Sequence, residues 1–245
     1  MLYGTRLRLL SIATLVLMTG GLALALFYAP MDADQGFMQK IFYVHVPLAI
    51  VALCGFVFGG ICAIAYLRTR EARHDLRSYV AIHLSLILGV AVLVTGSIWA
   101  KASWGHWFVW DEPTLVSFLI VFLLYATYQP MRFSIEDHER QARYASVFAI
   151  TAGAFVPLNF AAVRMAEAYT HPRVFATADG GLPPRMQLAF LVMLVAVTLL
   201  YVTLYRYEMT SKNTSAKLRS LRRKLAGDEA IAPVGRTAAP SVPTT

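Results

Sequence analysis

The sequence predicts an all-α integral membrane protein with six transmembrane helices, both termini in the cytoplasm and a tryptophan-rich loop on the outer face. Hydrophobic residues make up 58% of the 245 residues and charged residues only 15%, whereas a soluble domain carries about 25% charged residues. Several nearly uncharged stretches have the length of a helix that crosses a bilayer. The third observation is an uneven distribution of Lys and Arg along the chain, which predicts the orientation.

Six membrane spans are expected at about residues 9–29, 42–66, 79–100, 114–130, 144–163 and 187–207. The first resembles a signal peptide because Arg6 and Arg8 precede an apolar run. That run is too long for a signal sequence and no clear cleavage site follows it, so we interpret it as an uncleaved helix. Residues 1–207 then form the membrane domain. Residues 208–245 form a basic, then Ala/Pro/Thr-rich, cytoplasmic tail that we expect to be disordered.

The positive charges indicate which loops face the cytoplasm. Of the 22 Lys and Arg residues, 17 fall on the side that holds both termini and only five on the other side. Because cytoplasmic loops are enriched in Lys and Arg, the first side is expected to be cytoplasmic. The net charge of +8 is therefore a topology signal rather than a sign of nucleic-acid binding. The outer face is left with three loops, at about residues 30–41, 101–113 and 164–186.

The middle outer loop contains the stretch WGHWFVWD, residues 104–111, with three tryptophans, and Trp99 lies just before it. One explanation is an interfacial belt, because tryptophan collects where membrane meets water. The other is a platform for a flat, conjugated ligand, since indole rings stack on such surfaces. Asp111 also has two interpretations, because an acidic residue near a proline is typical of a helix start.

Two histidines are expected on the same face as the tryptophans. His45 begins the second span and His171 lies in the third outer loop, each shortly before a proline. They are either polar surface residues or axial ligands of an iron porphyrin, whose axial positions accept imidazole. His106, inside the tryptophan stretch, is the competing ligand. Three arginines of the third loop are candidates for pairing with heme propionates: Arg164, Arg173 and Arg185.

The stretch LVTGSIWAKASWGHWFVWD, residues 93–111, resembles the signature of the tryptophan-rich heme-handling membrane proteins. Together with FYVHVPLAI at the second span and the third-loop histidine, it is similar to the cytochrome c maturation protein C, or heme exporter protein C, family. One departure is Phe108, where the family has a second tryptophan. The resemblance implies heme b as cofactor, His45 and His171 as axial ligands, and a heme platform formed by five residues. These are Trp104, Gly105, Trp107, Trp110 and Asp111.

The resemblance also implies partners in the inner membrane and the periplasm. They are a periplasmic heme chaperone, an ATPase subunit of the ABC class, a second membrane subunit and a small single-span subunit. The chain contains no motif for catalysis or nucleotide binding, which predicts a heme-transfer subunit rather than an enzyme. The alternatives are a cytochrome c synthase subunit that attaches heme directly to apocytochrome c, a permease that moves heme, and an assembly subunit anchored by its aromatic loop.

Overall fold

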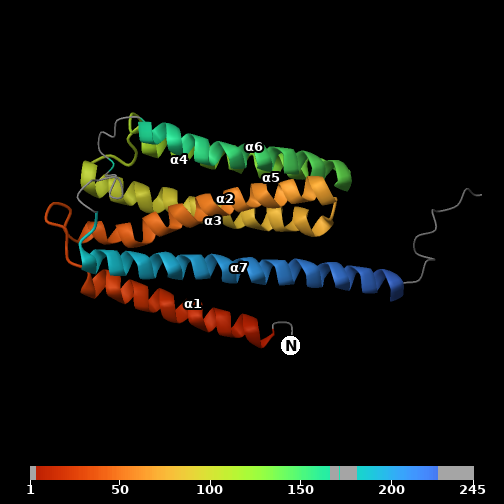
Figure 1. Cartoon of the computed structure of the whole chain (residues 1–245), viewed down its shortest axis with the longest axis horizontal. Coiled ribbons are helices and arrows are strands. Elements are labelled where there is room, and N and C mark those ends of the chain that lie inside the picture. Colours follow the sequence, from red (N-terminus) through yellow and green to blue (C-terminus); the bar gives the residue numbers. More distant parts are fainter. Residues whose placement is uncertain (1–3, 166–170, 172–180, 226–245) are drawn as a thin grey trace, which may run out of the picture. The chain divides into compact units, whose positions relative to one another are not determined.

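The computed structural model describes residues 4–165, 171 and 181–225, and this part of the chain is helical apart from its connections (Figure 1). The connection after the first helix contains an isolated bridge between Asp32 and Gly36. In chain order the elements are α1 (Thr5–Ala23), the π-helical turn η1 (Leu24–Tyr28), the 3-10 turn η2 (Phe37–Ile41), α2 (Phe42–Thr69), α3 (Ala72–Trp104), α4 (Pro113–Ala126), α5 (Tyr128–Phe133), α6 (His138–Met165) and α7 (Pro184–Leu225).

The prediction of six spans is confirmed. Six helical segments of the described residues are long and apolar enough to cross a membrane. The segments are longer than expected from hydropathy because helical geometry continues into polar residues at their ends. The third span, expected at 79–100, is the helix α3 from Ala72 to Trp104. Its last turn therefore contains Trp104, the first tryptophan of the motif, which the sequence places in the outer loop at residues 101–113.

The chain divides into two units, residues Met1–Met209 and Thr210–Thr245. The helix α7 continues to Leu225, so it includes the first part of the tail that was expected from residue 208. The physical reason is composition: residues 208–225 contain neither glycine nor proline, and these are the residues that most strongly interrupt a helix. Residues 226–245 lie outside the described residues.

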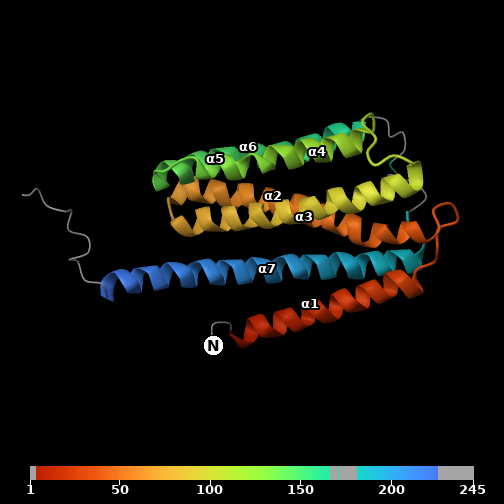
Figure 2. The ribbon, with the colours of Figure 1, turned by 180° about the vertical axis from the view of Figure 1, so that it is seen from behind.

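Within the first unit, α2 and α3 form a central pair. The helices α4 and α6 lie on one side of this pair, and α7 followed by α1 lies on the other, as opposite views agree (Figures 1 and 2). Small residues allow the close approach of α2 and α6: a methyl group on Gly60 would stand 3.0 Å from the carbonyl oxygen of Ala149. Close backbone contact through small residues is typical of membrane helices. Hydroxyl contacts join α1 to α7, where Thr14 and Thr203 lie 2.7 Å apart.

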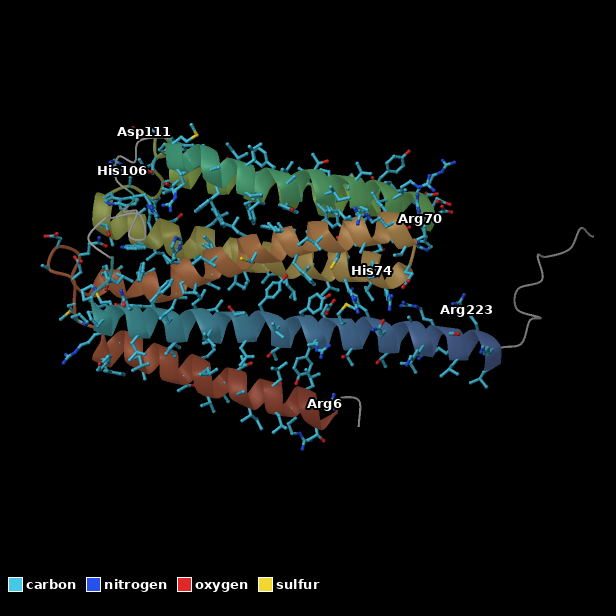
Figure 3. The ribbon with its side chains drawn as sticks, in the orientation of Figure 1. Arg6, Arg70, His74, His106, Asp111 and Arg223 are labelled. Atoms are coloured by element: carbon cyan, nitrogen blue, oxygen red, sulfur yellow. The ribbon has the colours of Figure 1, made fainter. Side chains whose placement is uncertain are left out.

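The two ends of the bundle differ in chemistry. Arg6, Arg70 and His74 lie at one end, and His106 and Asp111 at the other (Figure 3). We call the first the basic end and the second the tryptophan end.

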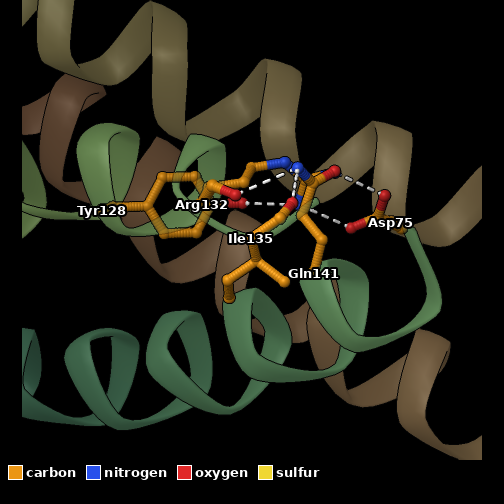
Figure 4. Close-up of polar contacts among 5 residues, drawn as sticks. All are labelled: Asp75, Tyr128, Arg132, Ile135 and Gln141. Carbon is orange, nitrogen blue, oxygen red and sulfur yellow. Dashed lines mark hydrogen bonds and ion pairs between the residues drawn. The ribbon is translucent and has the colours of Figure 1, made fainter. Parts of the chain in front are cut away.

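At the basic end, the guanidinium of Arg132 donates hydrogen bonds of 2.7 and 2.6 Å to the two carboxylate oxygens of Asp75 (Figure 4). The side chain of Gln141 donates to the carbonyl oxygens of Arg132 and Ile135. These contacts join α3, α5 and α6, and they fix the bundle at the end remote from the tryptophans.

Candidate functional site

A cavity of about 340 Å³ lies at the tryptophan end, between α2, α3, α4 and α6. This volume falls in the range of small-molecule binding sites. Most of the lining is apolar, with a few polar groups such as Ser117 and Asn159. The aromatic and imidazole part of the lining consists of His45, Trp99, Trp104, Trp107, Phe108, Phe118, Phe160 and His171.

His45 lies in the first turn of α2, which begins at Phe42. Its Nδ1 atom is 3.0 Å from the hydroxyl oxygen of Thr95 on α3. That hydroxyl donates its own proton to the carbonyl oxygen of Ala91, at 2.7 Å. The hydroxyl therefore accepts from His45, which places the ring proton on Nδ1 and leaves the lone pair on Nε2. An imidazole held in this way by its other nitrogen is the usual arrangement of a metal-binding histidine.

The space for the His45 ring is provided by a glycine. A methyl group built on Gly96 would stand 2.8 Å from the Cε1 atom of His45, closer than real contacts allow. The indole of Trp99, one turn further along α3, meets the imidazole edge-on at 5.8 Å between ring centres. Thr95, Gly96 and Trp99 thus fix the hydrogen bonding, position and tilt of the histidine ring from one face of α3.

The tryptophan loop, residues 105–112, begins where α3 ends. Gly105 has φ +77°, and its amide donates to the carbonyl oxygen of Lys101 at 3.1 Å. A left-handed residue at this position is the common way to end a helix, and glycine adopts it without strain. The turn leaves Trp104 in the last turn of α3, where its ring lies 6.3 Å from the ring of His171.

The structure brings together four of the residues proposed from the sequence. His45, His171, Trp104 and Trp107 all line the cavity. Trp107 remains 61% exposed, so it forms the rim of the cavity.

The remaining three proposed residues do not line the cavity. Gly105 forms the left-handed turn that ends α3. Trp110 is 74% exposed and packs against Phe108 at 4.7 Å between ring centres. Asp111 is exposed. The competing ligand His106 is also exposed and lies outside the lining.

The helix-cap interpretation applies to the neighbour of Asp111. Pro113 is the first residue of α4, and the residue before it, Glu112, is the N-cap, with its side chain accepting from the amide of Thr114. The sequence analysis missed Glu112 as a site residue, together with Trp99 and Phe108. The signal for the two aromatic residues was present, because both lie in the stretch that carries the family resemblance. No sequence signal marks Asn159 of α6.

Two of the three third-loop arginines belong to the residues that the structure describes. Arg164 lies over the ring of Phe160 and Arg185 over the ring of Tyr28, each at 5.4 Å. Neither belongs to the cavity lining. Arg173 lies outside the described residues.

Comparison with known proteins shows the family of this chain. The family model described as heme exporter protein C matches residues 1–224 of the chain. The chain belongs to the heme exporter protein C family. The heme exporter protein C of Bradyrhizobium diazoefficiens is 33% identical over 218 residues, which cover 87% of this chain and 81% of the relative. The heme exporter protein C of Escherichia coli K12 is 29% identical over 149 residues, 61% of this chain and 60% of the relative.

Membership of the heme exporter protein C family and the six apolar helices together identify a multi-pass membrane protein. The matched region contains every residue that lines the cavity. The site described above therefore lies entirely within the part of the chain that carries the family relationship.

Proposed function

We propose that this protein binds heme b as cargo in the cavity at the tryptophan end and presents it to a periplasmic heme chaperone for cytochrome c maturation. His45 and His171 are the axial ligands, and Trp104 and Trp107 contact the porphyrin. The observation that carries the proposal is that two histidines from distant segments line one cavity with two tryptophans of the motif. Membership of the heme exporter protein C family supports a role in heme export.

The chemistry of the cavity suits a porphyrin. The unprotonated Nε2 of His45 is the atom that iron binds, and the apolar walls suit the macrocycle. Val92, Val121 and Val156 are among these walls. The exposed Trp107 and Trp110 leave an aromatic rim at which a partner reaches the porphyrin edge. The chain itself forms and breaks no covalent bond in this proposal: it binds, orients and releases heme.

The proposed orientation places the tryptophan end on the periplasmic side of the inner membrane and both termini in the cytoplasm. The excess of Lys and Arg on the side of the termini supports it. The sequence carries no nucleotide-binding motif. An ATP-driven step therefore belongs to an ABC-type ATPase subunit, which acts with a second membrane subunit and a small single-span subunit.

The test is the absorption spectrum of the full chain purified from heme-sufficient cells. The unaltered protein is expected to show the Soret band of low-spin heme with two imidazole ligands. His45→Ala and His171→Ala are expected to lose heme or become high-spin, and added imidazole is expected to restore the low-spin band of a variant that retains heme. His106→Ala is the matched control, because His106 is exposed and outside the cavity, and its spectrum should equal that of the unaltered protein.

Two results would contradict the proposal. One is a purified protein without heme, which favours an anchoring role for the aromatic loop. The other is an unchanged spectrum in both histidine variants, which requires ligands elsewhere. Incubation of the heme-loaded protein with an apocytochrome c separates the synthase alternative. Formation of thioether bonds without the chaperone would support the synthase, whereas transfer of heme only when the chaperone is present supports the proposal.

A further inference from the structure

Glu112 is a buried carboxylate beside the site: it does not line the cavity, but it contacts the backbone amides of two residues that do, Thr114 and His171. Its exposed fraction is 0%, although the other residues of the tryptophan loop are exposed or partly exposed and its neighbour Asp111 is exposed. A buried carboxylate costs free energy unless its oxygens accept hydrogen bonds. A helix cap alone does not require this burial, because the exposed side chain of an Asp or Ser serves as well.

The two carboxylate oxygens of Glu112 accept hydrogen bonds from two different segments of the chain. Oε1 accepts from the backbone amide of Thr114, at 3.4 Å, in the first turn of α4. Oε2 accepts from the backbone amide of His171, at 3.2 Å. One side chain thus joins the start of α4, the end of the tryptophan loop and the backbone of the third-loop histidine. The positive end of the α4 dipole favours the negative charge at this position.

The ring contact of His171 depends on where its backbone is held. The ring lies 6.3 Å from that of Trp104 and lines the same cavity as His45. His171 is not part of a helix, whereas His45 is held in the first turn of α2 by Thr95. The two histidines therefore reach one cavity by different means, a helix for His45 and a side-chain-to-backbone contact for His171.

We propose that Glu112 is a positioning residue that fixes the backbone of His171 at the cavity. Its effect on heme ligation rests on the proposed function, but its effect on the His171 backbone does not. Loss of the Oε2 contact releases His171 while His45 keeps its place. The expected heme species then has one firm imidazole ligand and one that is partly dissociated.

The experiment compares Glu112→Asp, Glu112→Gln and Asp111→Asn in the full chain in detergent. Aspartate keeps the charge and is a good N-cap, but it is one methylene shorter and does not span both partners. Glutamine keeps one acceptor oxygen and loses the other. The first measurement is hydrogen exchange of the His171 amide in heme-free protein, where we expect exchange about tenfold faster in both Glu112 variants and unchanged in Asp111→Asn.

The second measurement is the heme spectrum of the same proteins. Both Glu112 variants are expected to gain a high-spin fraction that imidazole converts back to low-spin, while the melting temperature of Glu112→Asp changes little.

Unchanged exchange at His171 together with an unchanged spectrum would overturn the inference. Absence of heme from the unaltered protein would contradict the proposed function instead, and the exchange measurement would still decide the role of Glu112. A fallen melting temperature with unaltered exchange would reduce Glu112 to a helix cap and also overturn the inference.

Discussion

The indole nitrogen of Trp99 donates a hydrogen bond of 2.7 Å to the side-chain oxygen of Gln35. Gln35 lies in the loop before α2 and is itself held in a turn, because its backbone amide donates to the carboxylate of Asp32 at 2.9 Å. The hydroxyl of Ser103 reaches the same Gln35 oxygen at 3.3 Å. Since Trp99 lies edge-on to His45, a residue of the first loop controls the surroundings of the proposed iron ligand.

Replacement of Gln35 is expected to loosen Trp99. Gln35→Leu removes the acceptor from two donors, and the loss of a hydrogen bond in a partly buried site costs about 1 kcal/mol. We expect a lower melting temperature in detergent and a severalfold weaker affinity for heme. Gln35→Glu keeps an acceptor oxygen and should behave like the unaltered protein. Equal affinities for the Leu and Glu variants would show that the contact with Trp99 does not matter for binding.

Thr95 is expected to control the tautomer of His45. Thr95→Val keeps the shape of the side chain but removes the oxygen that accepts from Nδ1, so Nε2 is no longer kept free for iron. Loss of such a partner weakens metal binding by about 10- to 100-fold. Heme titration followed at the Soret band measures the change.

Two substitutions test whether the effect of Thr95 is specific to the histidine contact. Thr95→Ser restores the hydroxyl and should restore the affinity. Thr198→Val is a control for the loss of a threonine hydroxyl from a helix, because Thr198 is exposed and its hydroxyl donates to the carbonyl oxygen of Leu194 on the same helix. A Thr198→Val protein that binds heme as weakly as Thr95→Val would argue against a tautomer effect.

Gly96 is expected to be intolerant of even one methyl group. In Gly96→Ala the new carbon would meet the His45 ring at 2.8 Å, which displaces the imidazole. Overpacking of this kind costs about 1–3 kcal/mol, so heme affinity should fall by about tenfold or more. Gly20→Ala on α1 has no heavy atom within 4 Å of the new methyl and should leave binding unchanged. Tight heme binding by Gly96→Ala would mean that the ring position in the free protein is not the ligating one.

The helices and the membrane spans could be predicted because they depend on local properties: length, hydropathy and the absence of helix breakers. His45, His171, Trp104 and Trp107 could be named as candidates from the motif and the family resemblance, and the structure places all four in the lining of one cavity. Thr95 beside His45 and Glu112 beside His171 could not be identified as partners, since each pair forms only when separate segments pack together. The family resemblance assigned Trp110 to the platform, but the turn at Gly105 directs the loop so that Trp110 stays exposed.

The ion pair between Arg132 and Asp75 is expected to stabilise the bundle without affecting the site. The two side chains are only 9% and 16% exposed, and removal of one partner of such a pair costs about 3–5 kcal/mol. Asp75→Asn should therefore lower the melting temperature strongly, with an unchanged heme spectrum in the protein that remains folded. The pair of Arg143 and Glu139 is a matched exposed control at 50% and 71%, and Glu139→Gln should cost less than about 1 kcal/mol. A similar cost for both variants would indicate that the Asp75 pair is as hydrated as the exposed one.

Gly105 is expected to act through its backbone and not through contact with heme. Its φ of +77° is a conformation that asparagine tolerates and that a β-branched residue strongly disfavours. Gly105→Asn should therefore keep most of the heme affinity, because α3 still ends at Trp104 and Trp107 still reaches the rim of the cavity. Gly105→Val should shift the turn, separate Trp107 from the cavity and weaken heme binding about tenfold, corresponding to a strain of about 1–2 kcal/mol. A steric clash is not expected to cause the difference between the two variants, because no heavy atom lies within 4 Å of a methyl group built on Gly105. Equal loss of binding in Asn and Val would instead mean that any side chain at this position blocks the ligand, and would assign Gly105 to the contact surface.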